Sequence, residues 1–224
     1  MNRKGFTLIE LMLAMTFVSA LLLAVAMTVI QISNLYTRGL TVKEVNQAGR
    51  TIGTELKRGI SQSAPFAIPG GKYVSQTWGG RLCVGQYSYV WNYGPTLANS
   101  ATDKNNSNVY LDGKTKMSFI KVPDSAGVYC SNPASLIDNT SAVEMLAAGD
   151  NNLAMQSFSI ANSSTDPVSG EAIYSISYVI GTNDQAALSS GYTSCKPPSQ
   201  SGSDLNYCSI NQFDIVVRAL NALQ

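Results

Sequence analysis

The chain has 224 residues, which is enough for one domain with its own core and an additional segment. Its 15 Lys and Arg residues against 14 Asp and Glu give a net charge of +1, which argues against a strongly basic nucleic-acid-binding protein. The sequence contains no histidine, so it lacks the commonest general base and the commonest transition-metal ligand.

The first 32 residues combine a basic start with a long apolar run. The stretch "RKGFTLIELM" at 3–12 places two cations and a glycine before Phe6, and a single carboxylate, Glu10, beside the apolar run. A helix of about 20 apolar residues spans a hydrocarbon core of about 30 Å, so residues 11–32 predict a transmembrane helix. Because basic residues precede it, we expect the N-terminus in the cytoplasm and the rest of the chain outside. The polar interruptions of the run are Thr16, Ser19, Thr28 and Gln31.

Residues 33–63 change from uniformly apolar to amphipathic. Apolar residues recur at spacings of three, four and seven, which predicts one helical stripe that packs on a domain. One helix over 6–63 would be about 85 Å long at 1.5 Å per residue. Four glycines within it each weaken a helix by up to about 1 kcal/mol. The stripe is Leu35, Val42, Val45, Ile52, Leu56 and Ile60, and the glycines are Gly39, Gly49, Gly53 and Gly59.

The stretch "APFAIPGGK" at 64–72 ends the helix, because it holds two prolines and two glycines. Short β-like runs follow at 72–78, 81–91, 108–112, 116–122, 153–161, 172–180 and 212–219. The run 139–149 predicts the one helix of this part, capped by Asn139 or Thr140. Residues 64–224 thus predict a β-rich globular domain, and the whole chain an α+β fold in which the long N-terminal helix packs on antiparallel sheet.

The chain has four cysteines, all of them in this β-rich part and none in a Cys-x-x-Cys pair. An even number in a polar domain outside a membrane favours disulfides over a metal site. Of the three possible connectivities we favour Cys195–Cys208, which closes a short segment of the long loop 181–211, and by elimination Cys83–Cys130. The alternative is four buried thiols in a reducing compartment.

The order Lys4, Gly5, Phe6, Thr-Leu-Ile, Glu10 and then a spanning helix resembles the type IV prepilin signal of the pilin and pseudopilin superfamily. The resemblance implies a leader at 1–5, cleavage by prepilin peptidase between Gly5 and Phe6, and N-methylation of Phe6. It also implies that Glu10 neutralises the positive N-terminus of a neighbouring subunit when the helices pack into a filament. Two charges that are each unfavourable in lipid become tolerable when they are paired.

The cysteine-containing C-terminal part and the size of the body resemble the larger minor pilins of the PilW type, and the J-type pseudopilins of type II secretion are similar. These resemblances imply a pilin-like fold for the head domain. The implied partners are other pilin or pseudopilin subunits, prepilin peptidase, the cytoplasmic membrane and an inner-membrane assembly platform. The implied location is the cytoplasmic membrane before assembly, and then a surface pilus or a periplasmic pseudopilus.

Three further patterns favour ordinary structure over a site. Gly113-Lys-Thr lacks the preceding glycine of a phosphate-binding loop, because position 108 is Asn. The oxygen side chains within 103–108 lack the glycine and glutamate of a calcium loop. An alternating row could bind sugars or single-stranded DNA, but core packing is the preferred interpretation. That row is Cys83, Tyr87, Tyr89, Trp91 and Tyr93.

The sequence therefore predicts a minor pilin that helps initiate or cap a pilus for adhesion, motility or DNA uptake. The alternatives are a pseudopilin of a secretion or competence system and a membrane-tethered adhesin that never polymerises. We expect no enzyme, since no nucleophile and base can be paired, and no cofactor or metal. Nothing in the sequence establishes a nucleic-acid partner.

Overall fold

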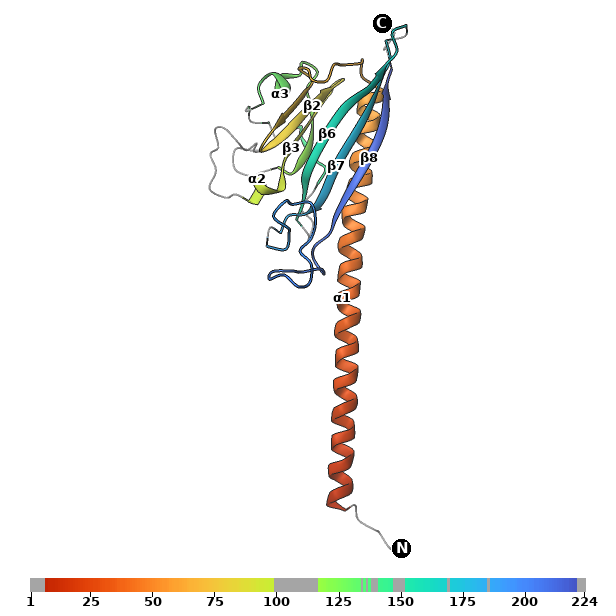
Figure 1. Ribbon diagram of the computed structural model, residues 1–224, viewed down its shortest axis with the longest axis vertical. Helices are drawn as coiled ribbons and strands as arrows, with labels where there is room; N and C mark the ends of the chain where they lie inside the picture. Colours follow the sequence, from red (N-terminus) through yellow and green to blue (C-terminus); the bar gives the residue numbers. More distant parts are fainter. Residues whose placement is uncertain are drawn as a thin grey trace.

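A computed structural model of the chain describes residues 7–98, 117–133, 135, 137, 141–146, 152–168, 170–184 and 186–220. One long helix extends well beyond a head made of two sheets (Figure 1). Within these residues the elements are α1 (Leu8–Ser61), β1 (Tyr73–Gln76), β2 (Gly79–Val84), β3 (Tyr87–Asn92), α2 (Gly94–Ala98), β4 (Phe119–Pro123), α3 (Val128–Ser131), β5 (Val143–Glu144), β6 (Leu153–Thr165), β7 (Ala172–Thr182) and β8 (Ile210–Ala219).

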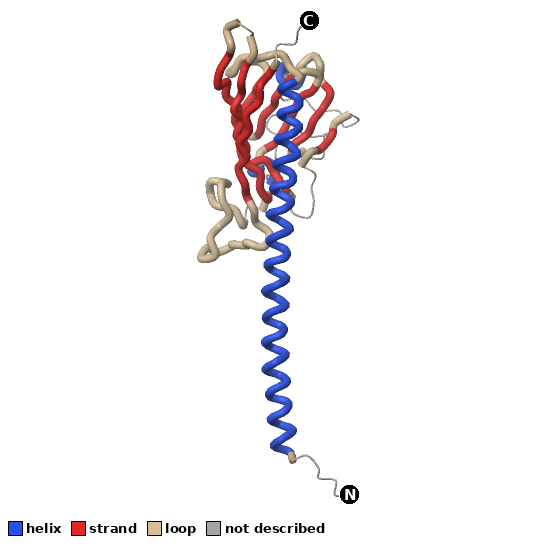
Figure 2. Tube along the Cα trace, turned by 90° about the vertical axis from the view of Figure 1, so that its right-hand side faces the viewer, coloured by secondary structure: helices blue, strands red, loops and turns tan. Residues whose placement is uncertain are grey.

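The strands form two antiparallel sheets. The first sheet has the order β1-β2-β3-β4-β5 and the second the order β6-β7-β8, so within each sheet the paired strands are neighbours in sequence. Figure 2 shows α1 running along the sheets through the upper half of its length. The expected α+β class is therefore confirmed, with a long N-terminal helix and antiparallel sheets.

Helix α1 has two halves with different environments. Residues 8–36 are all exposed, whereas seven residues from Thr41 onward are buried against the head. By length and apolar composition it is the one helix in the described part of the chain that could cross a membrane, and none of its apolar window is buried. The apolar half is therefore not the core helix of this head. The buried residues are Thr41, Val45, Gly49, Ile52, Gly53, Leu56 and Ile60.

The core lies between the packed half of α1 and the two sheets. Aromatic rings hold this core together. The ring centroids of Trp91 on β3 and Phe158 on β6, which belong to different sheets, are 4.4 Å apart. Those of Tyr178 on β7 and Phe213 on β8, neighbours in the second sheet, are 5.4 Å apart. Phe66, which follows α1, stacks on Tyr174 at 4.5 Å. Large aromatic side chains bury much apolar area each, so these pairs hold the two sheets together and fix the segment after α1 on β7.

The packing stripe on α1 differs in part from the predicted one. Val45, Ile52, Leu56 and Ile60 are fully buried as expected. Leu35 is 70% exposed because the head begins only at the level of Thr41. Val42 is 40% exposed because it lies about 100° around the helix from Thr41, which is the residue that faces the head. The prediction that these two pack on the domain was wrong.

Two other predictions require correction. The predicted helix over 139–149 is absent from the described residues 141–146, where β5 pairs with β4. The predicted strand 81–91 is two strands, β2 and β3, joined by a turn in which Gly85 has φ +59°. A positive φ is readily adopted by glycine, and it lets the chain reverse there.

Most of the remaining strands lie where the sequence predicts them. Strands β1, β4, β6, β7 and β8 overlap the runs 72–78, 116–122, 153–161, 172–180 and 212–219. The predicted strand 108–112, the rejected phosphate loop and the rejected calcium loop lie outside the described residues.

Candidate functional site

The carboxylate of Glu10 lies in the first turn of α1, where Thr7 is the N-cap. Thr7 donates to Oε2 of Glu10 from its backbone N–H at 2.9 Å and from its hydroxyl at 2.7 Å. The Glu10 N–H in turn points to the Thr7 hydroxyl oxygen at 3.4 Å, which completes a capping box. The acid is thus held at the positive end of the helix dipole, where a negative charge is favoured. Gly5 and Phe6 lie outside the described residues.

The polar side chains within the apolar half have partners on the helix itself. The hydroxyls of Ser19 and Thr28 donate to the carbonyls of Met15 and Ala24, both at 2.8 Å, and the Thr16 hydroxyl donates to Leu13 at 2.9 Å. A hydroxyl without a partner costs several kcal/mol in hydrocarbon. Because their hydroxyls are already hydrogen-bonded to the helix, these residues cost less free energy in hydrocarbon than free hydroxyls would.

Glycines on the packed half of α1 make room for rings of the head. A Cβ on Gly49 would lie 2.1 Å from Cζ of Phe213, and one on Gly53 would lie 2.5 Å from the hydroxyl oxygen of Tyr178. The Tyr178 hydroxyl donates to the carbonyl of Gly49 at 2.7 Å, and burial raises the pKa of Tyr178 to about 12, so it remains a donor. From the sequence alone, these glycines are expected only to weaken the helix. Their spacing is the signal that indicates packing on the head, because Gly49 and Gly53 lie on the same helical stripe as Val45, Ile52 and Leu56.

Polar contacts join α1 to both sheets and to the loop before β8. Glu55 forms an ion pair with Lys121 of β4 and accepts a hydrogen bond from the Tyr89 hydroxyl, whose pKa burial raises above its ordinary value. The Thr41 hydroxyl donates to the carbonyl of Asn206 at 3.0 Å. The Asn211 side chain donates to Asn46 at 2.7 Å. These contacts fix the angle at which the apolar half leaves the head.

The head contains two disulfides, Cys83–Cys130 and Cys195–Cys208, which are the pairs that the sequence analysis favours. The first joins β2 to α3. Asp124 supports this segment by accepting from the backbone of Tyr129 at 3.0 Å and the Ser88 hydroxyl at 2.7 Å. Burial opposes the ionisation of Asp124, but these hydrogen bonds outweigh it and lower its pKa.

The aromatic row of β3 is part of the core and not an exposed binding surface. Tyr89 and Trp91 are fully buried, and Tyr87 is 37% exposed with its ring 3.9 Å from the Lys121 ammonium. The preferred interpretation as core packing is confirmed for Tyr89 and Trp91, whereas Tyr87 lies at the surface beside Lys121. Cys83 belongs to the neighbouring strand β2, and its bond to Cys130 makes it a covalent link within the head.

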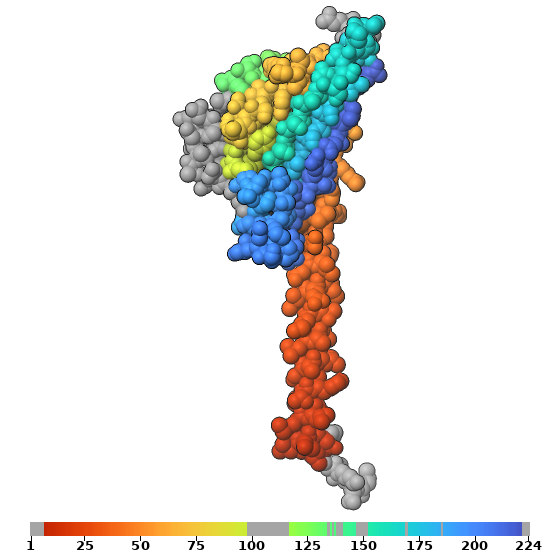
Figure 3. All heavy atoms as spheres, viewed as in Figure 1, coloured from red at the N-terminus to blue at the C-terminus, as the bar shows by residue number. Residues whose placement is uncertain are grey.

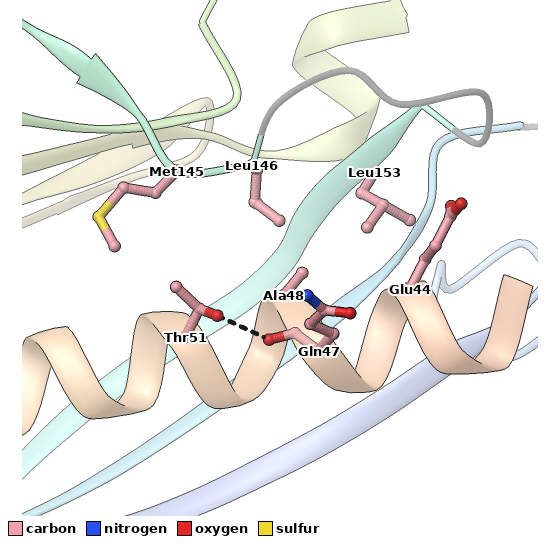
Figure 4. A pocket seen from close by; sticks show the side chains of 7 residues that line it. All are labelled: Glu44, Gln47, Ala48, Thr51, Met145, Leu146 and Leu153. Carbon is pink, nitrogen blue, oxygen red and sulfur yellow. Dashed lines mark hydrogen bonds between the residues drawn. The ribbon is translucent and has the colours of Figure 1, made fainter. Parts of the chain in front are cut away.

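A shallow groove of about 300 Å³ lies between α1 on one side and, on the other, the two residues that follow β5 and the first residue of β6 (Figure 4). Ala48, Met145, Leu146 and Leu153 give it apolar walls, while Glu44, Gln47 and Thr51 give it a polar edge. No three Cys, Asp or Glu side chains of the described residues converge in an arrangement that could hold a metal ion. Neither feature suggests a reaction.

No family model, no curated protein and no solved structure matches this chain.

Proposed function

We propose that this chain is a type IV pilin-like structural subunit, most similar to a minor pilin that helps initiate or cap a pilus. The observation that best supports this proposal is that the two halves of the continuous helix α1 have different surroundings. Its second half forms part of a folded head, and its first half presents apolar side chains that stay exposed among the described residues. Such a surface is costly in water, so it requires lipid in one state and neighbouring helices in another.

In this proposal, Glu10 is the residue that pairs with a neighbouring subunit during assembly. Glu10 follows Phe6 by four positions in the sequence, and prepilin peptidase would make Phe6 a new positive N-terminus by cutting the Gly5–Phe6 bond. In the single chain, the carboxylate bonds only to Thr7 among the contacts described. The proposed partners are therefore other pilin subunits, whose N-termini would pair with Glu10, together with the peptidase, the cytoplasmic membrane and an inner-membrane assembly platform.

The first test is intact-mass and N-terminal analysis of the chain from sheared surface filaments and, separately, from membranes. A chain that begins at a methylated Phe6 in the sheared fraction supports the minor-pilin proposal. Processed chain found only in membranes favours a pseudopilin of a secretion or competence system. A mature chain that still begins at Met1 contradicts the proposal and leaves an anchored domain.

The second test separates an assembling subunit from a simple tether. We expect Glu10→Ala to reduce incorporation into filaments at least about tenfold, because the neighbouring N-terminus would be left unpaired in an apolar environment. The matched control is Lys57→Gln, which removes one charge from an exposed position of the same helix outside the apolar half. Incorporation of the Glu10→Ala chain at the parental level would contradict the assembly role of Glu10. Absence of both the parental and the Glu10→Ala chain from filaments would indicate an adhesin that never polymerises.

A further inference from the structure

The segment between β7 and β8 forms the part of the head that lies nearest the apolar half of α1. We call its described residues, 183–184 and 186–209, the base loop. Figures 1 and 2 show it from two directions, extending beyond the ends of the second sheet along the helix toward the N-terminus. Figure 3 shows it as a bulge at the bottom of the head.

The base loop is held in one shape by its own contacts. The Cys195–Cys208 disulfide closes it, and Ala187 and Leu188 are buried beside Cys208. Lys196 donates its backbone N–H to the carbonyl of Ala187 at 2.8 Å. Because these contacts already fix the loop, its binding to a partner does not have to include the entropy cost of ordering it.

The contact between the base loop and α1 sets its height above the apolar run. Asn206 accepts from the hydroxyl of Thr41, which is only 1% exposed. Thr41 follows the last residue of the 11–32 run by nine positions, or about 14 Å along the helix. Headgroup layers extend about 5–8 Å beyond each side of the hydrocarbon core, and a spanning helix tilts by about 20° on average. The Thr41 contact therefore lies a little beyond the headgroup layer, and the base loop extends from this contact along the helix toward the apolar run and the headgroups (Figures 1 and 2).

The exposed residues of the base loop, and those of α1 just after the apolar run, have the chemistry of a membrane interface. Tyr36 on α1 is 68% exposed and Tyr207 on the base loop is 55% exposed, and tyrosine is enriched where hydrocarbon meets water. Leu35 is 70% exposed beside Tyr36. The ionisable residues of the base loop and of α1 between the apolar run and Thr41 have both signs, which suits a zwitterionic headgroup layer rather than one particular anionic lipid. They are Arg38 on α1 and Asp184, Lys196 and Asp204 on the base loop.

We propose that the base loop rests on the phospholipid headgroups of the outer leaflet. Tyr207 of the base loop and Tyr36 of α1 anchor this contact. The contact fixes how far the head stands above the bilayer while the chain is stored in the membrane. Extraction of the helix for assembly then breaks this contact. This inference rests on the membrane-spanning part of the proposed function.

The test places tryptophan in the full chain and reconstitutes it in phosphatidylcholine vesicles that contain lipid brominated near the headgroup end of the acyl chain. We expect the emission added by Tyr207→Trp to be quenched. The matched control is Val168→Trp, at a position 94% exposed in the hairpin between β6 and β7, and its added emission should not change. The parental chain supplies the emission of Trp78 and Trp91 for subtraction.

A third variant keeps this inference separate from the proposed function. Phe17→Trp lies within the apolar run and should be quenched by lipid brominated deep in the acyl chain. Quenching of Phe17→Trp without quenching of Tyr207→Trp overturns the inference alone. No quenching of Phe17→Trp overturns the membrane span and, with it, the proposed function. An intact mass that includes both disulfides shows that each variant is fully oxidised. Tyr36→Trp, on the exposed part of α1, probes the same headgroup layer as Tyr207→Trp at a position outside the head.

Discussion

At the scale of single residues, glycine has two opposite roles on α1. A Cβ at Gly39 would meet no atom within 4 Å, whereas one at Gly49 would collide with the ring of Phe213. We expect Gly39→Ala to stabilise the chain by up to about 1 kcal/mol and Gly49→Ala to destabilise it by about 1–3 kcal/mol. Urea unfolding in detergent, followed by tryptophan emission, measures both. A Gly49→Ala, Phe213→Leu double variant should recover part of the loss, and additive effects would contradict the proposed collision.

Glu144 gives the head a pH dependence. Its carboxylate accepts from the backbone of Phe119 at 2.9 Å and Leu146 at 3.1 Å, but burial dominates and raises its pKa from 4.5 to about 7. Between these values the unfolded chain releases the proton first, so the folded state loses stability as the pH rises from 4.5 to 7. The denaturation midpoint of the parental chain should fall over this range relative to that of Glu144→Gln. Parallel midpoint profiles for the two chains would refute the assignment.

At the scale of elements, the two disulfides stabilise segments of different length. Cys83–Cys130 has a sequence separation of 47 and Cys195–Cys208 one of 13. Loop-closure entropy predicts losses of about 4 and about 3 kcal/mol when each pair is replaced by serine. Removal of Cys195–Cys208 should also make the base loop sensitive to limited proteolysis while β6 and β7 stay protected. Equal proteolysis of the two serine variants at the base loop would count against this local role.

The sequence predicts the elements whose pattern is long or whose neighbours are near in the chain. The α1 helix follows from its apolar run and stripe, and β6 and β7 follow from alternation that a short hairpin then pairs. The error at 139–149 has a tertiary cause. Ala, Glu, Met and Leu favour a helix locally, but Glu144 accepts from Phe119 across the sheet, and Val143 pairs with Lys121. Contacts of this range cannot be derived from local propensity.

The candidate site divides in the same way. Glu10 is evident in the sequence because a lone acid beside an apolar run is unusual, and its capping partner Thr7 lies within one turn. The contact between Thr41 and Asn206 is separated by 165 positions, so no local pattern indicates it. The buried glycines of α1 likewise acquire their meaning only from the rings that β7 and β8 bring to them.

At the scale of the whole molecule, α1 and β8 run in the same direction along one another. Asn46 bonds to Asn211, Gly49 faces Phe213, and Gly53 faces Ile215, so successive positions on the helix meet successive positions on the strand. A force that pulls the apolar half along its axis therefore loads these contacts together in shear, and does not peel them apart one after another. The head would follow its helix under tension as one mechanical unit.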